Sequence, residues 1–165
     1  MGSRKGIGVT IAILVGVVAA SFLVYLIPED TTMKITVSDF GKHLDITKER
    51  ASMEITSVDE SFEKLMKNKS DSDEYIRIAE ISSLQVNSLI IELTNSGAPQ
   101  EWTESYVNYI HALKKLNEII TETIVVANLI DSNDNSDSIN EIIAKIHQLK
   151  TESLNLTEKS DAARP

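Results

Sequence analysis

Residues 7–27 contain no charged side chain, and this run limits what the start of the chain can fold into. A helix of this length reaches roughly 32 Å at about 1.5 Å per residue, which matches the hydrocarbon core of a bilayer. The run therefore predicts a transmembrane anchor preceded by a short basic N-terminus, residues 1–6. A cleaved signal peptide is the alternative, because Val18-Ala19-Ala20 fits a small-residue cleavage site.

The charges on either side of this run predict its orientation. Arg4 and Lys5 precede it, and Glu29 and Asp30 follow it directly. Positively charged residues favour the cytoplasmic side of a membrane. We therefore expect a cytoplasmic N-terminus, a juxtamembrane linker over residues 28–37, and a domain outside the cell membrane.

One side of the predicted anchor carries only small residues. Four of them recur at every fourth position: Gly8, Ala12, Gly16 and Ala20. Residues at this spacing share a helix face, and small side chains let two membrane helices approach closely. The pattern predicts packing against another transmembrane helix, either a second copy or a partner subunit.

Beyond residue 37, apolar residues recur at intervals of three, four or seven, which is typical of a helix with one buried face. Four such stripes are separated by polar turns, and they begin near Phe40, Tyr75, Trp102 and Ile139. Short turns favour antiparallel neighbours. The sequence thus predicts an all-α fold with an antiparallel bundle of about four helices over residues 38–158. An open coiled-coil oligomer is the alternative.

Polar residues and Gly or Pro mark the expected helix ends. Ser38 or Asp39 can cap the first helix, Gly97 can end the second and Pro99 can open the third. A capping box that starts at Ser138 predicts the start of the fourth helix. Residues 159–165 then form a polar tail.

The composition argues against catalysis and against nucleic acid. The chain has no cysteine and only six glycines, with no nucleophile elbow or phosphate loop, and its net charge is −9. None of the three histidines, His43, His111 and His147, follows a glutamate by three positions, so we expect surface histidines and no metal. We predict that the protein is not an enzyme and uses no cofactor.

One turn resembles a calcium loop. Asp131, Asn133 and Asn135 place oxygen side chains at alternate positions between two helices. Ser136 stands where an EF-hand needs glycine, and Ile142 stands where it needs a bidentate glutamate. We therefore expect an ordinary polar turn, with calcium binding as the alternative.

Two triplets match the acceptor pattern for N-glycosylation. Asn68 begins one of them in a predicted turn, and Asn155 begins the other near the end of the last predicted helix. Both are candidate modification sites if the domain lies outside the cell.

Two parts of the chain resemble known families. The start, SRKGIGVTIAILVG, looks like the N-terminus of archaeal type IV prepilins and archaellins. That resemblance implies peptidase cleavage after Gly6, assembly into a filament, and a β-rich head where the spacing predicts helices. The helical remainder is similar in outline to the four-helix extracytoplasmic sensor modules of chemoreceptors, which implies ligand sensing.

These observations favour a membrane-anchored accessory or scaffold subunit that acts through protein contacts, rather than a protein that takes a small-molecule ligand. The alternatives are a sensor-like ligand-binding module and a pilin-like filament subunit. In the sensor-like module, Trp102, Tyr106 and Tyr109 would line a pocket. A cavity beside Trp102 would favour ligand binding, whereas a filled core with exposed apolar side chains would favour the scaffold.

Overall fold

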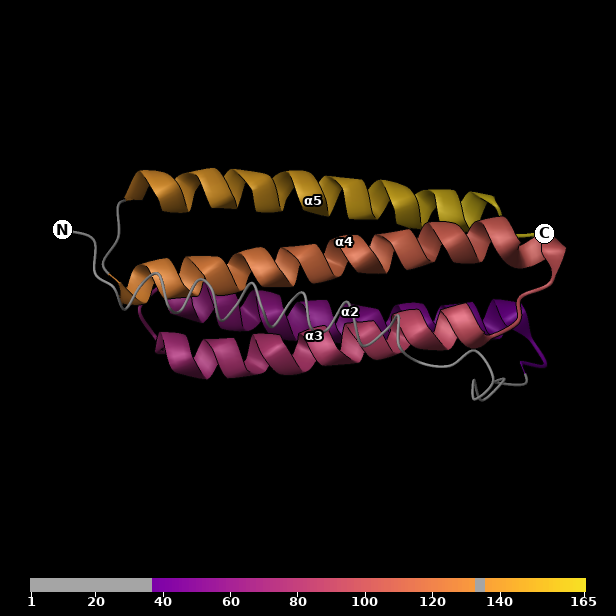
Figure 1. Ribbon diagram of the computed structural model, residues 1–165, viewed down its shortest axis with the longest axis horizontal. Coiled ribbons are helices and arrows are strands. Elements are labelled where there is room, and N and C mark those ends of the chain that lie inside the picture. The colour runs from indigo at the N-terminus through magenta and orange to yellow at the C-terminus, as the bar shows by residue number, and fades with distance from the viewer. Residues whose placement is uncertain (1–36, 133–135) are drawn as a thin grey trace, which may run out of the picture. The chain divides into compact units, whose positions relative to one another are not determined.

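A computed structural model describes residues 37–132 and 136–165 of the chain. The regular elements of this part are four helices: α2 (Phe40–Met66), α3 (Ser72–Asn95), α4 (Gln100–Asp131) and α5 (Ser136–Ala162). Consecutive helices run antiparallel and lie side by side (Figure 1). The predicted all-α helical bundle is confirmed for this part of the chain, in which no residue belongs to a strand.

The longest helix, α4, lies at the centre of the packing. It contacts α2, α3 and α5, and α2 also packs along α3. No Cα atom of α2 lies within 8 Å of a Cα atom of α5. Three pairs of consecutive helices therefore close against each other, and the fourth seam, between α2 and α5, stays open at the level of the backbone.

The buried side chains follow the predicted helical spacing. On α2 the buried apolar residues are Leu44, Ala51, Val58 and Leu65, each seven positions after the last. Seven residues are close to two helical turns, so these side chains form one row along the helix. Burying a leucine or valine side chain stabilises the fold by about 2 kcal/mol, so such rows dominate the stability of the bundle.

The start of α2 and the turn between α3 and α4 form as predicted. The Asp39 carboxylate accepts a hydrogen bond from the backbone N–H of Lys42 at 2.9 Å and caps α2. Gly97 adopts a positive φ of 66° in the turn after α3, a conformation that favours glycine. Pro99 is the N-cap of α4, where its missing N–H is not needed.

The boundaries of α5 differ from the prediction. The helix begins at Ser136, so Ser138 lies inside it and does not cap its start. Serine, aspartate and asparagine fill this turn, and because each of them can cap a helix the pattern does not fix the first residue. At its other end α5 continues to Ala162, into the stretch predicted to be a polar tail.

The extension of α5 is packed against the bundle. Ser160 is fully buried, and the Ser105 hydroxyl on α4 donates a hydrogen bond to its carbonyl oxygen at 2.7 Å. A small hydroxyl side chain lets two helices approach closely while its polar groups stay paired. The apolar pattern could not reveal this contact, because serine does not count toward an apolar stripe.

The membrane anchor falls outside the part of the chain that the structure describes. Within residues 37–132 and 136–165, no helix has the length and apolar character needed to cross a bilayer. The predicted anchor, residues 7–27, lies outside these ranges together with its small residues Gly8, Ala12, Gly16 and Ala20.

Candidate functional site

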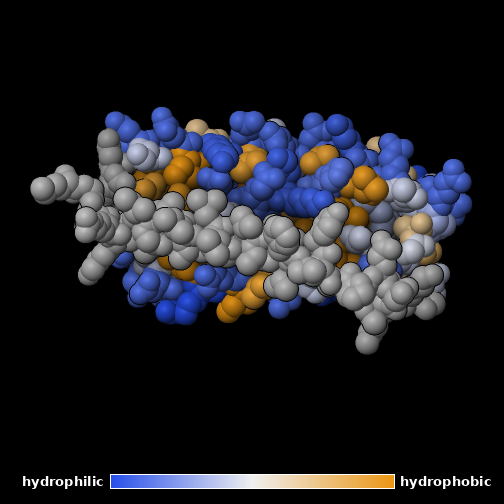
Figure 2. Space-filling view, viewed as in Figure 1, coloured by the Kyte–Doolittle hydropathy of each residue, from blue (hydrophilic) through white to orange (hydrophobic). Residues whose placement is uncertain are grey.

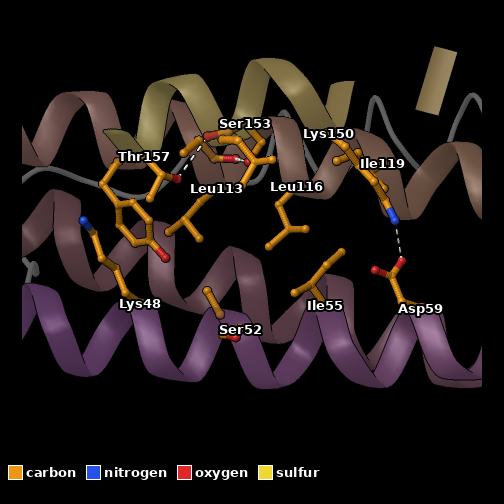
Figure 3. Close-up of a pocket in the computed structure, with 14 residues that line it drawn as sticks. Lys48, Ser52, Ile55, Asp59, Leu113, Leu116, Ile119, Lys150, Ser153 and Thr157 are labelled. Carbon is orange, nitrogen blue, oxygen red and sulfur yellow. Dashed lines mark hydrogen bonds and ion pairs between the residues drawn. The ribbon is translucent and has the colours of Figure 1, made fainter. Parts of the chain in front are cut away.

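The open seam between α2 and α5 forms a groove of about 390 Å³. Its walls come from α2 and α5, and its floor comes from α4 (Figure 3). The floor is apolar, with Leu113, Leu116 and Ile119, and Ile55 of α2 and Leu154 of α5 add apolar side chains to the lining. Leu154 is 66% exposed. The groove therefore presents an apolar surface that the bundle itself does not bury.

Three ion pairs join α2 to α5 and to the residues that follow α5, across or beside this groove. Their closest nitrogen–oxygen distances are 2.6 to 2.8 Å, and the pairs are Lys48 with Asp161, Lys150 with Asp59, and Arg164 with Asp45. The hydrogen bond from Arg164 holds the pKa of Asp45 below its usual value. The carboxylate of each pair is 45% to 61% exposed, and ion pairs open to solvent contribute about 0 to 1 kcal/mol each, so they hold the seam only weakly.

Tyr109 of α4 supplies a polar group at one end of the groove. Only 5% of its surface is exposed, and Lys48 Nζ lies 5.1 Å from the centre of its ring, within range of a cation–π contact. No residue in the described ranges forms a hydrogen bond with its hydroxyl. Burial raises the pKa of Tyr109, so the hydroxyl remains a neutral donor at physiological pH.

A second polar cluster joins α2, α3 and α4 near the start of α2. His43 Nδ1 lies 2.9 Å from the Tyr106 hydroxyl, and His43 Nε2 lies 3.0 Å from Glu92 Oε1. Arg50 donates to the other oxygen of Glu92 at 2.8 Å, and the Tyr106 hydroxyl donates to the carbonyl oxygen of Phe40 at 3.0 Å. The cluster therefore fixes one end of α2 against its neighbours.

The histidines divide into two groups. His111 and His147 are exposed, as predicted, whereas the side chain of His43 is only 14% exposed. The partners of the His43 side chain, Glu92 and Tyr106, lie on two other helices, α3 and α4. The position of His43 along its own helix therefore could not predict its burial. Within the described ranges, no three histidine or acidic side chains lie close enough together to hold a metal ion.

The three aromatic residues of the predicted pocket have different surroundings. Trp102 packs edge-on against Tyr106, with ring centres 6.3 Å apart. A Cβ atom added at Gly41 would lie 3.2 Å from the Cη2 atom of Trp102. Of the three aromatic residues, only Tyr109 lines the groove. The helical spacing correctly placed the three rings on one helix. It could not predict that Tyr109 lines the groove while Trp102 and Tyr106 pack near the start of α2.

The other predicted sites lie at the surface or outside the described residues. Asp131 ends α4 and is exposed, while Asn133 and Asn135 lie outside the described ranges, so calcium binding stays untested. Asn68 is exposed in the turn after α2, and Asn155 is exposed on α5. Glycosylation of either residue remains a prediction.

Comparison of the chain with protein-family models, with characterised proteins and with solved structures gives no significant match. The function must therefore be argued from the residues themselves.

Proposed function

We propose that this chain is a single-pass membrane protein whose helical bundle lies outside the cell membrane and acts as an accessory or scaffold subunit through protein contacts. The uncharged run over residues 7–27 supports the anchor. Arg4 and Lys5, which precede that run, support a cytoplasmic N-terminus. The small-residue face of the run supports a contact with a partner helix in the bilayer.

Exposed apolar side chains on the outer surfaces of α2 and α3 carry the scaffold proposal. Ile46 and Met53 of α2 are 44% and 59% exposed, and Leu84 and Ile91 of α3 are 69% and 50% exposed. The two residues of each pair are seven positions apart, so they lie on the same side of their helix. Figure 2 shows apolar atoms protruding among hydrophilic ones at the edge of the bundle where α3 runs.

The spacing also indicates the kind of partner. Apolar residues seven positions apart form the seam of helix pairs such as coiled coils, in which a second amphipathic helix covers them. Apolar side chains exposed on neighbouring helices are typical of protein contact surfaces. In this proposal the partner subunit therefore presents an amphipathic helix to α2 and α3.

Cysteine labelling tests the topology, because the chain has no native cysteine. We propose two single variants, Ser3→Cys in the basic N-terminus and Ser88→Cys on the exposed surface of α3. A membrane-impermeant maleimide added to intact cells is expected to label Ser88→Cys, and to label Ser3→Cys only after permeabilisation. Equal labelling of both variants in intact cells would contradict the topology.

Site-directed photocrosslinking tests the contact surface. A photoreactive phenylalanine analogue at Ile91 is expected to give one discrete crosslinked species in membranes. The double variant Met53→Glu/Leu84→Glu should lose this species, because buried carboxylates oppose docking. Leu154→Glu makes the same change on α5, where the leucine is also largely exposed, and should keep it. A species that survives the double variant would contradict the proposed surface.

The membrane contact has its own test. Gly16→Ile adds bulk to the predicted small-residue face, and we expect it to weaken association of the anchor in a membrane two-hybrid assay. Val17→Ile, at the next position in the run, is the matched control. Equal association of both variants with the unmodified chain would show that this face does not pack on a partner.

A further inference from the structure

The outer face of α3 carries no charged side chain over its middle. Residues 81–91 contain none, although 25% of the residues of the chain are charged. Ile81, Leu84 and Ile91 are 60%, 69% and 50% exposed on this face. Ser88 is exposed as well and completes a row, the α3 strip, with intervals of three, four and three residues. This is the spacing of a coiled-coil seam, so the α3 strip can form one side of a helix pair.

The outer face of α2 is different. Ile46 and Met53 are exposed there, but Glu49 and Arg50 are exposed between them. Residues three and four positions after Ile46 share its side of the helix, so these charges lie within the apolar row. Charges in a contact surface select a partner of opposite charge. The α3 strip offers a partner only apolar groups and one hydroxyl group.

An uncharged strip suits a contact with a second copy of the same helix. When two parallel helices pair about a two-fold axis, each seam residue meets its own copy. A charged seam residue would then lie against the same charge, which opposes pairing. The Ser88 hydroxyl can both donate and accept a hydrogen bond, so it can pair with the same group of the other copy. The α3 strip is therefore complementary to itself.

The residues beside the strip favour the parallel arrangement. In a parallel pair, a residue at position g lies beside the residue five positions later in the other copy. Glu80 then lies beside Gln85, and Asn87 lies beside Glu92, so each carboxylate meets an amide group. In an antiparallel pair centred on the strip, Glu80 would lie opposite Glu92. The parallel arrangement avoids this contact between like charges.

We propose that the partner of the α3 face is a second copy of this chain, paired in parallel through the α3 strip. The inference rests on the proposed function, because it names the partner of that contact surface and because the anchor holds both copies in one bilayer. A single helix face buries little area, so the pairing is weak and reversible. A shared membrane raises the effective concentration of the two copies. Ser88 stays accessible in the copies that are not paired.

Engineered cysteines test the pairing, because the chain has no native cysteine. Leu84→Cys, in the full chain in membranes, should form a disulfide with its own copy under mild oxidation. Leu154→Cys is the matched control, since this leucine is 66% exposed but lies on α5. We expect at least about tenfold more disulfide dimer from Leu84→Cys, because its seam position brings the two sulfur atoms together. Equal yields would overturn the proposal, since they would show that the copies meet without a preferred face.

Charges placed at Ser88 test whether the residue meets its own copy. In the Leu84→Cys background, Ser88→Glu and Ser88→Lys should each lower the disulfide yield about fivefold, because like charges then meet in the seam. Ser88→Gln is the neutral control and should keep the yield. Coexpression of Ser88→Glu and Ser88→Lys under different epitope tags should restore a dimer that carries both tags. A yield that stays low in this mixture would overturn the pairing. Ser88 is exposed, so the variants should keep their helices, which circular dichroism checks.

A mixture of two cysteine variants tests the orientation. In a parallel pair, Ile81→Cys of one copy and Ile91→Cys of the other lie about 15 Å apart along the helix, too far for a disulfide. An antiparallel pair would bring them together. A mixed disulfide with the yield of Leu84→Cys would therefore overturn the parallel arrangement.

The species photocrosslinked from Ile91 separates this inference from the proposed function. With two differently tagged copies in one membrane, a species of twice the chain mass that carries both tags supports a second copy. A discrete species of another mass with a single tag would overturn the second copy and leave the proposed contact surface intact. The absence of any discrete species would contradict both proposals.

Discussion

The seam between α3 and α4 and the seam between α2 and α5 solve the same packing problem in different ways. Between α3 and α4, the Tyr75 hydroxyl donates to Thr123 Oγ1 at 2.5 Å, and both residues are buried. Further along, the Ser83 hydroxyl donates to Asn117, which in turn donates to Asn87. This seam is closed by short side chains that are paired and packed.

Between α2 and α5, by contrast, long charged side chains reach across an apolar floor. Lys48 and Lys150 pair with acidic residues on the opposite helix, and water reaches these pairs. The comparison shows that this helical bundle has a packed core although the backbones of α2 and α5 are not packed against each other. Packing holds the first seam, and weak ion pairs hold the second.

The largest effect is expected from matched leucine substitutions in the closed core and at the open seam. Leu89 of α3 is 1% exposed, so Leu89→Ala leaves a cavity and should lower the free energy of unfolding by about 3 kcal/mol. Leu154 borders the open groove, and Leu154→Ala should change it by less than about 0.5 kcal/mol. Urea unfolding of the full chain, followed by circular dichroism, measures both. Similar losses at the two positions would break the comparison.

The sequence predicted the positions of the helices better than it predicted which helices pack against each other. Leu44, Ala51 and Val58 repeat every seven residues, and this spacing alone predicts which face of α2 is buried. It does not say which helix covers that face. The open seam arises because α5 packs on α4 and not on α2, and this choice depends on contacts between residues far apart in the chain.

The candidate site could be predicted only in part. Tyr109 was singled out together with Trp102 and Tyr106, since all three follow the helical spacing. Which of the rings borders a groove depends on α2 and α5, and no local pattern encodes that. His43 and Ser160 were missed for the same reason, because the residues that bury and pair them lie on other helices.

A smaller effect on the free energy of unfolding is expected when the pH is lowered, because Glu92 lies at the seam between α2 and α3. Burial raises the pKa of Glu92, but the hydrogen bonds and charges of Arg50 and His43 outweigh this effect and hold the pKa below its usual value. A depressed pKa contributes stability above the unfolded value, and this contribution is lost as the pH falls through the folded value. We expect the free energy of unfolding to fall as the pH is lowered below about 5, through the folded pKa of Glu92.

Glu92→Gln tests this expectation, because it removes the titrating group. The variant should be less stable than the unmodified chain at pH 7, and it should lose less stability on acidification in urea unfolding series. Glu80→Gln, on the exposed surface of the same helix, should follow the unmodified chain at each pH. If Glu92→Gln showed the same acid dependence as the unmodified chain, this cluster would be no stronger than the ion pairs of the open seam.

The smallest effect on stability is expected at the open seam itself. A substitution there distinguishes a change in the free energy of unfolding from a change in local opening of the seam. Lys150 and Asp59 are 38% and 45% exposed, so Lys150→Met should lower the free energy of unfolding by no more than about 0.5 kcal/mol. Removal of this ion pair should nevertheless raise hydrogen exchange in the part of α5 that faces the groove. Exchange around Thr123 on α4 should not change. Faster exchange at both seams would show that they open together, whereas unchanged exchange at both would show that the ion pair does not restrain the groove.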